Sequence, residues 1–389
     1  MSGTSVLAPL VEPVPQLSRE EVTRYARHLS LPEVGEIGQR RLRAARVLVI
    51  GAGGLGAPVL QYLGAAGIGH ISVIDDDRVE TSNLQRQILH RDADVGRPKV
   101  ESARDALLRL DPHLSVAAID DRLTPDNALS LFAAHDLVID GADNFATRYL
   151  SNDAAELTGT PLVWGTIFRF EGQVSTFVPG HGPMLRDLFP DIPDADSVPS
   201  CAEGGVLGVL CGLVGSTMAA EAIKLICGIG EPLIGRLLRC DALTTAFTTL
   251  RFSADPDRRA VTDLAEVTAA CAAPAVTAAP PVAEATVAEV RDGSGEAVIV
   301  DVRESWERQI VSIPGSVHVP LAAIVASGWP ALAEAVGGAA DIVLHCRSGV
   351  RSATALEAAA PGAPAGVRLR SLAGGIEAWT AVAADDQQL

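Results

Sequence analysis

The stretch VLVIGAGGLGAP, Val47 to Pro58, runs an apolar segment into Gly51, Gly53 and Gly56. This pattern predicts a buried strand that turns directly into a helix. Glycines at this spacing let the backbone approach a phosphate at the helix N-terminus. Asp75 ends the next apolar run, where an acidic group can hold ribose hydroxyls. Together these features favour a nucleotide site over glycines that serve only a tight turn.

Further apolar runs continue the alternation of strand and helix. ISVID (Ile71 to Asp75) and LVID (Leu137 to Asp140) are typical of strands that are separated by helical stretches. The sequence therefore predicts a Rossmann-like α/β domain, with a mixed, mostly parallel sheet that helices cover on both faces.

An alanine- and proline-rich stretch separates this domain from a second one. AVIVDVRE (Ala297 to Glu304) and DIVLHC (Asp341 to Cys346) predict strands of a smaller α/β unit. We predict a first domain over residues 15–265, a linker over 266–287 and a second domain over 288–385.

Composition limits the partners and the compartment. A formal net charge of -17 over 389 residues argues against a nucleic-acid partner. The N-terminus lacks a secretion signal, and the uncharged run Gly204 to Ala220 is shorter than the ~20 residues of a membrane span, so we predict a buried helix there and no membrane partner. The six cysteines form no CxxC pair, which fits a reducing cytoplasm; they are Cys201, Cys211, Cys227, Cys240, Cys271 and Cys346.

Two cations follow the glycine stretch at the expected strand ends. Arg86 and Lys99 are not needed for nicotinamide chemistry, but they suit the charge of a triphosphate. Asp143 follows another strand, where a carboxylate can hold the magnesium ion that bridges phosphates. Either cation alone could be an ordinary surface charge, whereas the whole set favours ATP.

The GAGGLG, SNLQRQ, PK and DN elements resemble the ubiquitin-activating-enzyme-like adenylyltransferases that activate sulfur carrier proteins, the MoeB and ThiF family. The resemblance covers about Leu17 to Phe252. It implies a homodimer in which Arg27 reaches the triphosphate of the other subunit. The implied ATP contacts are Gly51, Gly53, Gly54, Asp75, Ser82, Asn83, Leu84, Gln85, Arg86, Lys99, Asp143 and Asn144, with magnesium at Asp143.

The same resemblance implies the reaction. The C-terminal glycine carboxylate of a small ubiquitin-like carrier, ending in Gly-Gly, would attack the α-phosphate of ATP. The carrier tail is expected near Arg169 to Gln173, and Cys201 matches a cysteine that can attack the activated carrier or help release the product. Two alternatives stay open: a conjugation enzyme with a carrier thioester on Cys201, and a nicotinamide-dependent oxidoreductase.

Family members commonly hold zinc with two CxxC pairs. Here Met184 and Asp187 stand at the first pair, and the second falls in SADPDRRAVTD, residues 253–263, which lacks cysteine. These residues could not rebuild a tetrahedral thiolate site, so we predict no structural zinc.

The stretch HCRSGVRS, His345 to Ser352, ends a predicted strand at a cysteine. Loop amides that point inward could hold a thiolate or persulfide. Four residues separate Cys346 from Arg351, one fewer than in tyrosine phosphatase loops, which favours sulfur over phosphate. The predicted persulfide loop consists of Cys346, Arg347, Ser348, Gly349, Val350 and Arg351.

The surrounding motifs resemble the rhodanese fold. They are VDVRE (Val300 to Glu304), IPGSVHVP (Ile313 to Pro320) and LAGGIEAW (Leu372 to Trp379), with Ser312 as a departure where histidine is common. The two halves together resemble the adenylyltransferase and sulfurtransferase type of the MoeB and ThiF family. This implies that a Cys346 persulfide, loaded from thiosulfate or a cysteine desulfurase, attacks the carrier adenylate. The sequence leaves the carrier open among molybdenum cofactor, thiamine, cysteine and tRNA thiolation pathways.

Overall fold

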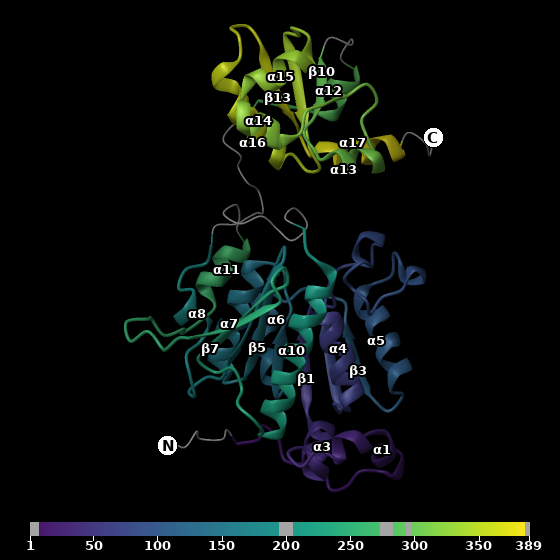
Figure 1. Cartoon of the computed structure of the whole chain (residues 1–389), viewed down its shortest axis with the longest axis vertical. Helices are drawn as coiled ribbons and strands as arrows, with labels where there is room; N and C mark the ends of the chain where they lie inside the picture. The colour runs from purple at the N-terminus through teal and green to yellow at the C-terminus, as the bar shows by residue number, and fades with distance from the viewer. Residues whose placement is uncertain (1–7, 194–204, 273–282, 293–296, 386–389) are drawn as a thin grey trace. The chain divides into compact units, whose positions relative to one another are not determined.

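The computed structural model describes residues 8–193, 205–272, 283–292 and 297–385. It divides into two units, Met1–Ala273 and Pro274–Leu389, each with its own sheet (Figure 1).

The first unit is built on an eight-stranded sheet of order β3-β2-β1-β4-β5-β6-β7-β8. The strands from β3 to β5 pair in parallel, and those from β5 to β8 pair antiparallel. The predicted mixed, mostly parallel sheet is therefore confirmed. The strands are β1 (Arg46–Ile50), β2 (His70–Ile74), β3 (Ser115–Ile119), β4 (Leu137–Asp140), β5 (Leu162–Phe168), β6 (Glu171–Phe177), β7 (Arg236–Asp241) and β8 (Ala246–Arg251).

Alternating side chains of β1 enter two separate cores. Val47 and Val49 pack with residues of α3, α4, α5 and α10, whereas Leu48 and Ile50 pack with residues of α6, α7, α8 and α11. The helices of this unit are α1 (Arg19–Arg24), α2 (Ala26–Leu29), α3 (Gly35–Ala44), α4 (Gly56–Ala66), α5 (Lys99–Leu110), α6 (Pro125–Ala133), α7 (Phe145–Thr158), α8 (Leu185–Leu188), α10 (Gly208–Cys227) and α11 (Ala265–Ala272), with 3-10 turns η1 (Thr81–Asn83) and η2 (Asp92–Asp94).

Helix α10 is, within the described residues, the one helix long and apolar enough to cross a membrane by length and composition. It packs against α4 and the strands β5 and β6, and Leu210, Val214 and Met218 on it are buried. These contacts confirm the predicted buried helix. Cys211, Cys227 and Cys240 are also buried.

The second unit holds a parallel sheet of order β11-β10-β12-β13-β9. Helices α14, α15 and α16 cover one face, and α12 and α17 cover the other. The strands are β9 (Glu284–Ala285), β10 (Val298–Asp301), β11 (Val317–His318), β12 (Asp341–His345) and β13 (Arg368–Leu372). The helices are α12 (Val287–Asp292), α13 (Ser305–Ile310), α14 (Leu321–Ser327), α15 (Trp329–Val336), α16 (Val350–Ala359) and α17 (Gly375–Asp385), with the 3-10 turn η3 (Ala360–Gly362).

The boundaries differ from the prediction at both ends of the linker, residues 266–287. Helix α11 occupies its first part, because Val267 is fully buried in the core beside α7. At the other end, β9 pairs with β13, and Ala285 and Val287 are buried in the second unit. Both ends are thus ordered by long-range packing that composition does not reveal.

Candidate active sites

The glycine loop joins β1 to α4 at the carboxyl end of the parallel strands. Gly51 has a φ of +88°, and a Cβ on Gly56 would lie 1.9 Å from the Gly51 carbonyl oxygen, so the turn excludes larger residues. The N–H groups of Gly53 and Gly54 have no acceptor in the described part of the chain. Free amides at a helix N-terminus are suited to bind an anion.

Asp75 and Lys99 lie beside this loop. The Ala52 N–H donates to Asp75 Oδ2 at 2.7 Å, and burial raises the pKa of the Asp75 carboxyl. The Lys99 side chain is only 7% exposed, and its Nζ donates to Asp77 Oδ2 at 2.6 Å. Lys99 is therefore a buried cation of the site and not a loose surface charge. The carboxylates of Asp75, Asp76 and Asp77 lie within 4.8 Å of one another.

The SNLQRQ segment lies against the glycine loop. Arg86 donates through Nη1 to the Ser82 carbonyl at 3.1 Å, and a Cβ on Gly54 would lie 3.7 Å from Arg86 Cγ. Asn83 is buried and accepts the Glu80 N–H. Leu84 and Gln85 continue the segment beyond η1. The structure thus places Arg86 beside the glycine loop.

The DN turn follows β4, which pairs with β1. Asp143 is exposed, and the side chain of Asn144 accepts the Thr147 N–H at 2.8 Å, which caps α7. Asp140 is fully buried at the end of β4, and burial raises its pKa to about 6. Its Oδ1 accepts the Ala142 N–H at 2.9 Å. The structure adds to the predicted ligand role of Asn144 a local role in starting a helix.

Arg27 lies at the other end of the sheet. It is exposed on α2, whose neighbour Tyr25 donates to Asp111 and would meet a Cβ on Gly67 at 2.4 Å. Gly67 precedes β2, so α2 lies where the strands begin, and the glycine loop lies where they end. The structure therefore does not bring Arg27 to the glycine loop of its own chain.

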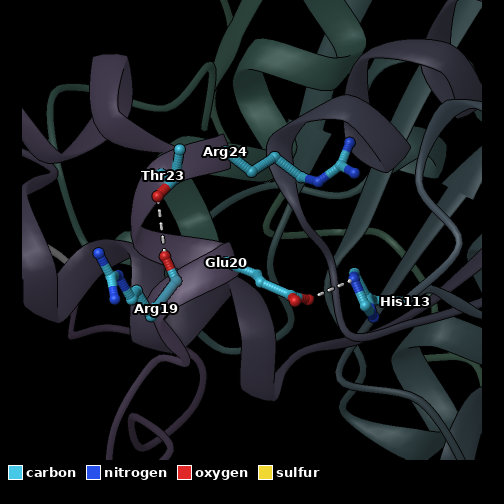
Figure 2. Close-up of a pocket in the computed structure, with 5 residues that line it drawn as sticks. All are labelled: Arg19, Glu20, Thr23, Arg24 and His113. Carbon is cyan, nitrogen blue, oxygen red and sulfur yellow. Dashed lines mark hydrogen bonds and ion pairs between the residues drawn. The ribbon is translucent and has the colours of Figure 1, made fainter.

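A separate hollow of about 530 Å³ lies at this end of the sheet (Figure 2). Arg19, Thr23 and Arg24 line it from α1, and Glu20 pairs with His113 at 3.3 Å. It contains none of the predicted site residues.

The segment predicted to meet the carrier tail, Arg169 to Gln173, forms the turn between β5 and β6 and the first residues of β6. Arg169 has a φ of 54°, and its N–H and carbonyl bond to Gly205 and Leu207. Arg169 lines a hollow of about 490 Å³, together with Phe168, Phe170 and Leu243. Cys201 lies outside the described residues.

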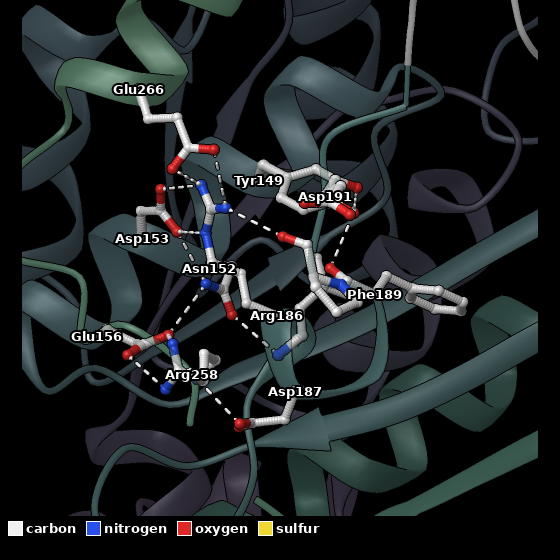
Figure 3. Close-up of polar contacts among 12 residues, drawn as sticks. Tyr149, Asn152, Asp153, Glu156, Arg186, Asp187, Phe189, Asp191, Arg258 and Glu266 are labelled. Atoms are coloured by element: carbon white, nitrogen blue, oxygen red, sulfur yellow. Dashed lines mark hydrogen bonds and ion pairs between the residues drawn. The ribbon is translucent and has the colours of Figure 1, made fainter. Parts of the chain in front are cut away.

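Ion pairs join the two segments in which the family resemblance would place CxxC pairs (Figure 3). Asp187 accepts from Arg258 Nε at 2.9 Å and from the Asp255 N–H at 3.0 Å. Arg258 also pairs with Glu156 on α7 at 2.9 Å. Met184 is buried beside them. These contacts give Asp187 a cationic partner from the protein itself.

The second site is the loop between β12 and α16. Cys346 is 1% exposed, and its Sγ accepts the Gly349 N–H at 3.1 Å. The hydroxyl of Ser352 lies 3.6 Å from the same sulfur and 2.8 Å from that of Ser371. Gly349 has a φ of +112° and is the N-cap residue of α16. The loop therefore places the sulfur at a helix N-terminus, among donors.

Both arginines of the loop pair with carboxylates. Arg351 binds Glu307 of α13 through two 2.7 Å contacts, and Arg347 binds Glu377 at 2.6 Å. Ser348 and Val350 complete the loop between them. Sequence reasoning missed these partners and the two serines, because they come from other elements. Glu307 follows the VDVRE motif and Glu377 lies within GGIEAW, and this is the one signal that could have found them.

A buried charged cluster lies beneath this loop. Asp301 pairs with Arg303 at 2.8 Å, and His345 Nε2 lies 3.7 Å from Asp301 Oδ2. Burial lowers the pKa of His345 to about 4. The residue next to the reactive cysteine is thus held neutral at ordinary pH.

The two sites define a class of protein that combines a nucleotide-dependent adenylation fold with a cysteine loop for sulfur. Residues 25–260 match the model of the ThiF family, and residues 285–382 match that of the rhodanese-like domain. The chain belongs to the ThiF family, with a rhodanese-like domain at its C-terminal end. It is an adenylyltransferase and sulfurtransferase.

Relatives share this organisation. The chain is 50% identical over 383 residues to the probable adenylyltransferase/sulfurtransferase MoeZ of Mycobacterium tuberculosis, covering 96% of both chains. It is 38% identical to the adenylyltransferase and sulfurtransferase MOCS3 of Bos taurus, over 98% of this chain and 90% of the relative. The sulfur carrier protein adenylyltransferase of Thermus thermophilus is 53% identical over 61% of this chain and 90% of its own.

Solved structures support the fold of the first unit. A crystal structure of Escherichia coli MccB matches with a TM-score of 0.54 at 22% identity, over 61% of this chain and 74% of that chain. At this identity the likeness concerns the fold alone.

Proposed function

We propose that the enzyme uses ATP to adenylate the C-terminal glycine carboxylate of a small ubiquitin-like sulfur carrier that ends in Gly-Gly, and then delivers sulfur from Cys346. The observation that carries this proposal is the presence of two built sites in one chain: free glycine-loop amides beside Lys99, and a cysteine sulfur surrounded by donors. The names of the Thermus relative and of the SAMP-activating enzyme E1 of Haloferax volcanii point to a protein substrate.

At the first site the protein supplies position and charge. The amides of Gly53 and Gly54, with Arg86 and Lys99, would hold the triphosphate, and Asp75 would face the ribose. Asp143 offers an exposed carboxylate for magnesium, an ion that prefers oxygen ligands and retains water. Bound magnesium would neutralise the charge that develops on the phosphates.

Arg27 supports a homodimer in this proposal. It is exposed, and it lies at the strand end opposite its own glycine loop. Arg27 could therefore meet a triphosphate only on a second copy of the chain.

The chemistry balances in three steps. A carboxylate oxygen of the carrier bonds to the α-phosphorus, and pyrophosphate leaves. The terminal sulfur of a Cys346 persulfide then bonds to the acyl carbon, and AMP leaves. Finally a thiol, from Cys201 or an external donor, bonds to Cys346 Sγ and breaks the S–S bond, which leaves a thiocarboxylate on the carrier.

The persulfide needs a donor such as thiosulfate or a cysteine desulfurase. We assign these reactions to the cytoplasm, where thiols stay reduced. We also propose that the enzyme holds no structural zinc.

The test is intact mass spectrometry of each candidate carrier after incubation with enzyme, ATP and thiosulfate. The expected product is a carrier in which sulfur replaces one oxygen. A Cys346→Ala variant should retain carrier-dependent exchange of pyrophosphate into ATP but make no thiocarboxylate. Cys240→Ala, which removes a different buried thiol, is the matched control and should make product.

Loss of exchange in Cys346→Ala, with Cys240→Ala intact, would contradict the division of labour between the sites. An intact carrier bound to Cys201 without sulfur would favour the conjugation enzyme instead. Preference for NAD over ATP would favour the oxidoreductase.

A further inference from the structure

We propose that His90 positions the glycine loop for the nucleotide, by holding the Ala52 carbonyl so that the Gly53 N–H points at the phosphates. This inference rests on the proposed adenylation function. It adds a residue, His90, that contacts the glycine loop from the buried interior of the unit.

His90 joins the loop to a buried polar chain. Its Nε2 lies 2.9 Å from the Ala52 carbonyl oxygen, and its Nδ1 lies 2.9 Å from Ser102 Oγ. Ser102 Oγ lies 2.9 Å from Asp94 Oδ2, and Asp94 pairs with Arg97 at 2.6 Å. His90, Ser102 and Asp94 are all buried. The ring is therefore fixed at both nitrogens, away from solvent.

The hydrogen bonds also fix the proton on the ring. A carbonyl oxygen only accepts, so Nε2 must carry the proton. Burial lowers the pKa of His90, as does the nearby Lys99 cation, whereas the Asp75 and Asp94 carboxylates oppose this shift. The Ser102 hydroxyl has one proton, which it donates to Asp94 Oδ2, so the Ser102 oxygen is the atom that lies against Nδ1.

Holding this carbonyl sets the direction of the next amide. The Ala52–Gly53 peptide is trans, so its N–H and C=O groups point in opposite directions. With the Ala52 carbonyl on His90, the Gly53 N–H faces away from the protein core, and it has no acceptor among the described residues. The preceding peptide is also held, because the Ala52 N–H donates to Asp75 Oδ2. The buried His90 and the half-buried Asp75 thus orient successive peptides of the loop.

Two near-isosteric substitutions separate the two ring contacts. His90→Gln places an amide donor near the Nε2 position and keeps the bond to Ala52. His90→Asn places the amide donor near the Nδ1 position, so this variant keeps only the bond to Ser102. His135→Asn is the matched control, because His135 bonds Leu131 and Ser72 through 2.7 Å contacts elsewhere in the same unit.

The measurement is steady-state pyrophosphate exchange at varied ATP, with the full-length enzyme and carrier. We expect His90→Asn to raise KM for ATP about five- to tenfold, from the loss of one hydrogen bond, with kcat within about twofold. His90→Gln should restore KM to within about twofold. His135→Asn should leave KM unchanged even if its thermal midpoint falls as much as that of His90→Asn.

Equal KM values in His90→Asn and the wild type would overturn the positioning role, and so would equal KM increases in the Asn and Gln variants. A wild-type enzyme without carrier-dependent exchange would instead contradict the proposed function. The two failures are therefore distinguishable.

Discussion

The sulfur of Cys346 is almost completely covered, yet it has to exchange sulfur with other molecules. Cys346 is 1% exposed, and its Sγ accepts the Gly349 N–H. A second sulfur extends the side chain by about 2 Å. The outer atom of a persulfide would therefore lie about 2 Å beyond the buried Sγ, while the inner sulfur stays beside the Gly349 N–H and the Ser352 hydroxyl.

His345 makes the stability of the second unit depend on pH. Its folded pKa of about 4 lies below the ordinary value near 6.5, so between these values the unfolded chain binds a proton that the folded chain does not. Stability should therefore fall as pH drops through this window, by about 3 kcal/mol in total. Urea unfolding from pH 7 to 4.5 measures this change.

The matched variants for this prediction are His345→Gln and His318→Gln. Replacing His345 should flatten the pH dependence of unfolding of the second unit. His318 bonds the Arg303 carbonyl at 2.7 Å and is half-buried, and its replacement should leave the slope in place. Equal slopes in the wild type and His345→Gln would show that another group titrates.

Single residues were predictable where their role depends on near neighbours in the sequence. The glycine spacing identified Gly51 and Gly56, and the strand ends identified Asp75. The partners were not predictable, because His90, Asp77 and Glu307 reach their targets only through the tertiary fold. His90 lies three residues after the quoted SNLQRQ stretch, but nothing local marks it as a partner of Ala52.

At the scale of elements, an ion-pair network ties α8 and the segment after β8 to α7 (Figure 3). Arg258 contacts both Glu156 and Asp187, and Arg186 contacts Asp153 on α7 and Glu266 on α11. The Asp187 and Asp153 carboxylates are nearly buried, so each depends on its arginine to compensate its negative charge.

Removing one cation from this network should destabilise the first unit. Arg258→Ala removes the cationic partner of two shielded carboxylates, Glu156 and Asp187. We expect the free energy of unfolding in urea to fall by about 2–3 kcal/mol. Arg239→Ala is the control, since Arg239 and Glu171 form an exposed pair at 3.0 Å and should matter by less than about 1 kcal/mol. Similar losses of unfolding free energy in the two variants would show that the buried network contributes no more to stability than an exposed ion pair.

The elements themselves were predictable to different degrees. Long apolar runs such as Val47 to Ile50 identified the central strands, because burial on both faces requires them. Helix α11 was predicted as linker, since its alanine-rich sequence shows no clear periodicity. It becomes a helix because Val267 packs into the core and Glu266 pairs with Arg186.

At the scale of the whole molecule, the chain contains two sets of cores that share no residue. The cores beside β1 belong to the first unit, and those beside β10 and β12 belong to the second. The division into two domains was predictable from composition alone, whereas their edges required the contacts of α11 and β9.

We expect the two units to unfold independently. Calorimetry should give two transitions, with Arg258→Ala lowering only one and His345→Gln at pH 5 raising only the other. A single transition that both variants shift together would contradict independent unfolding.

The docking of α11 changes how much chain separates the two reactive units. If residues 252–272 did not pack against the first unit, the stretch of chain that connects the two units would run from the end of β8 at Arg251 to the start of β9 at Glu284. Because α11 is anchored through Val267 and Glu266, the connection starts only at Ala272. A shorter connection loses less conformational entropy when its ends are brought together, and it raises the effective concentration of one end near the other. The anchoring of one short helix thus favours transfer within the molecule over transfer to a competing acceptor in solution.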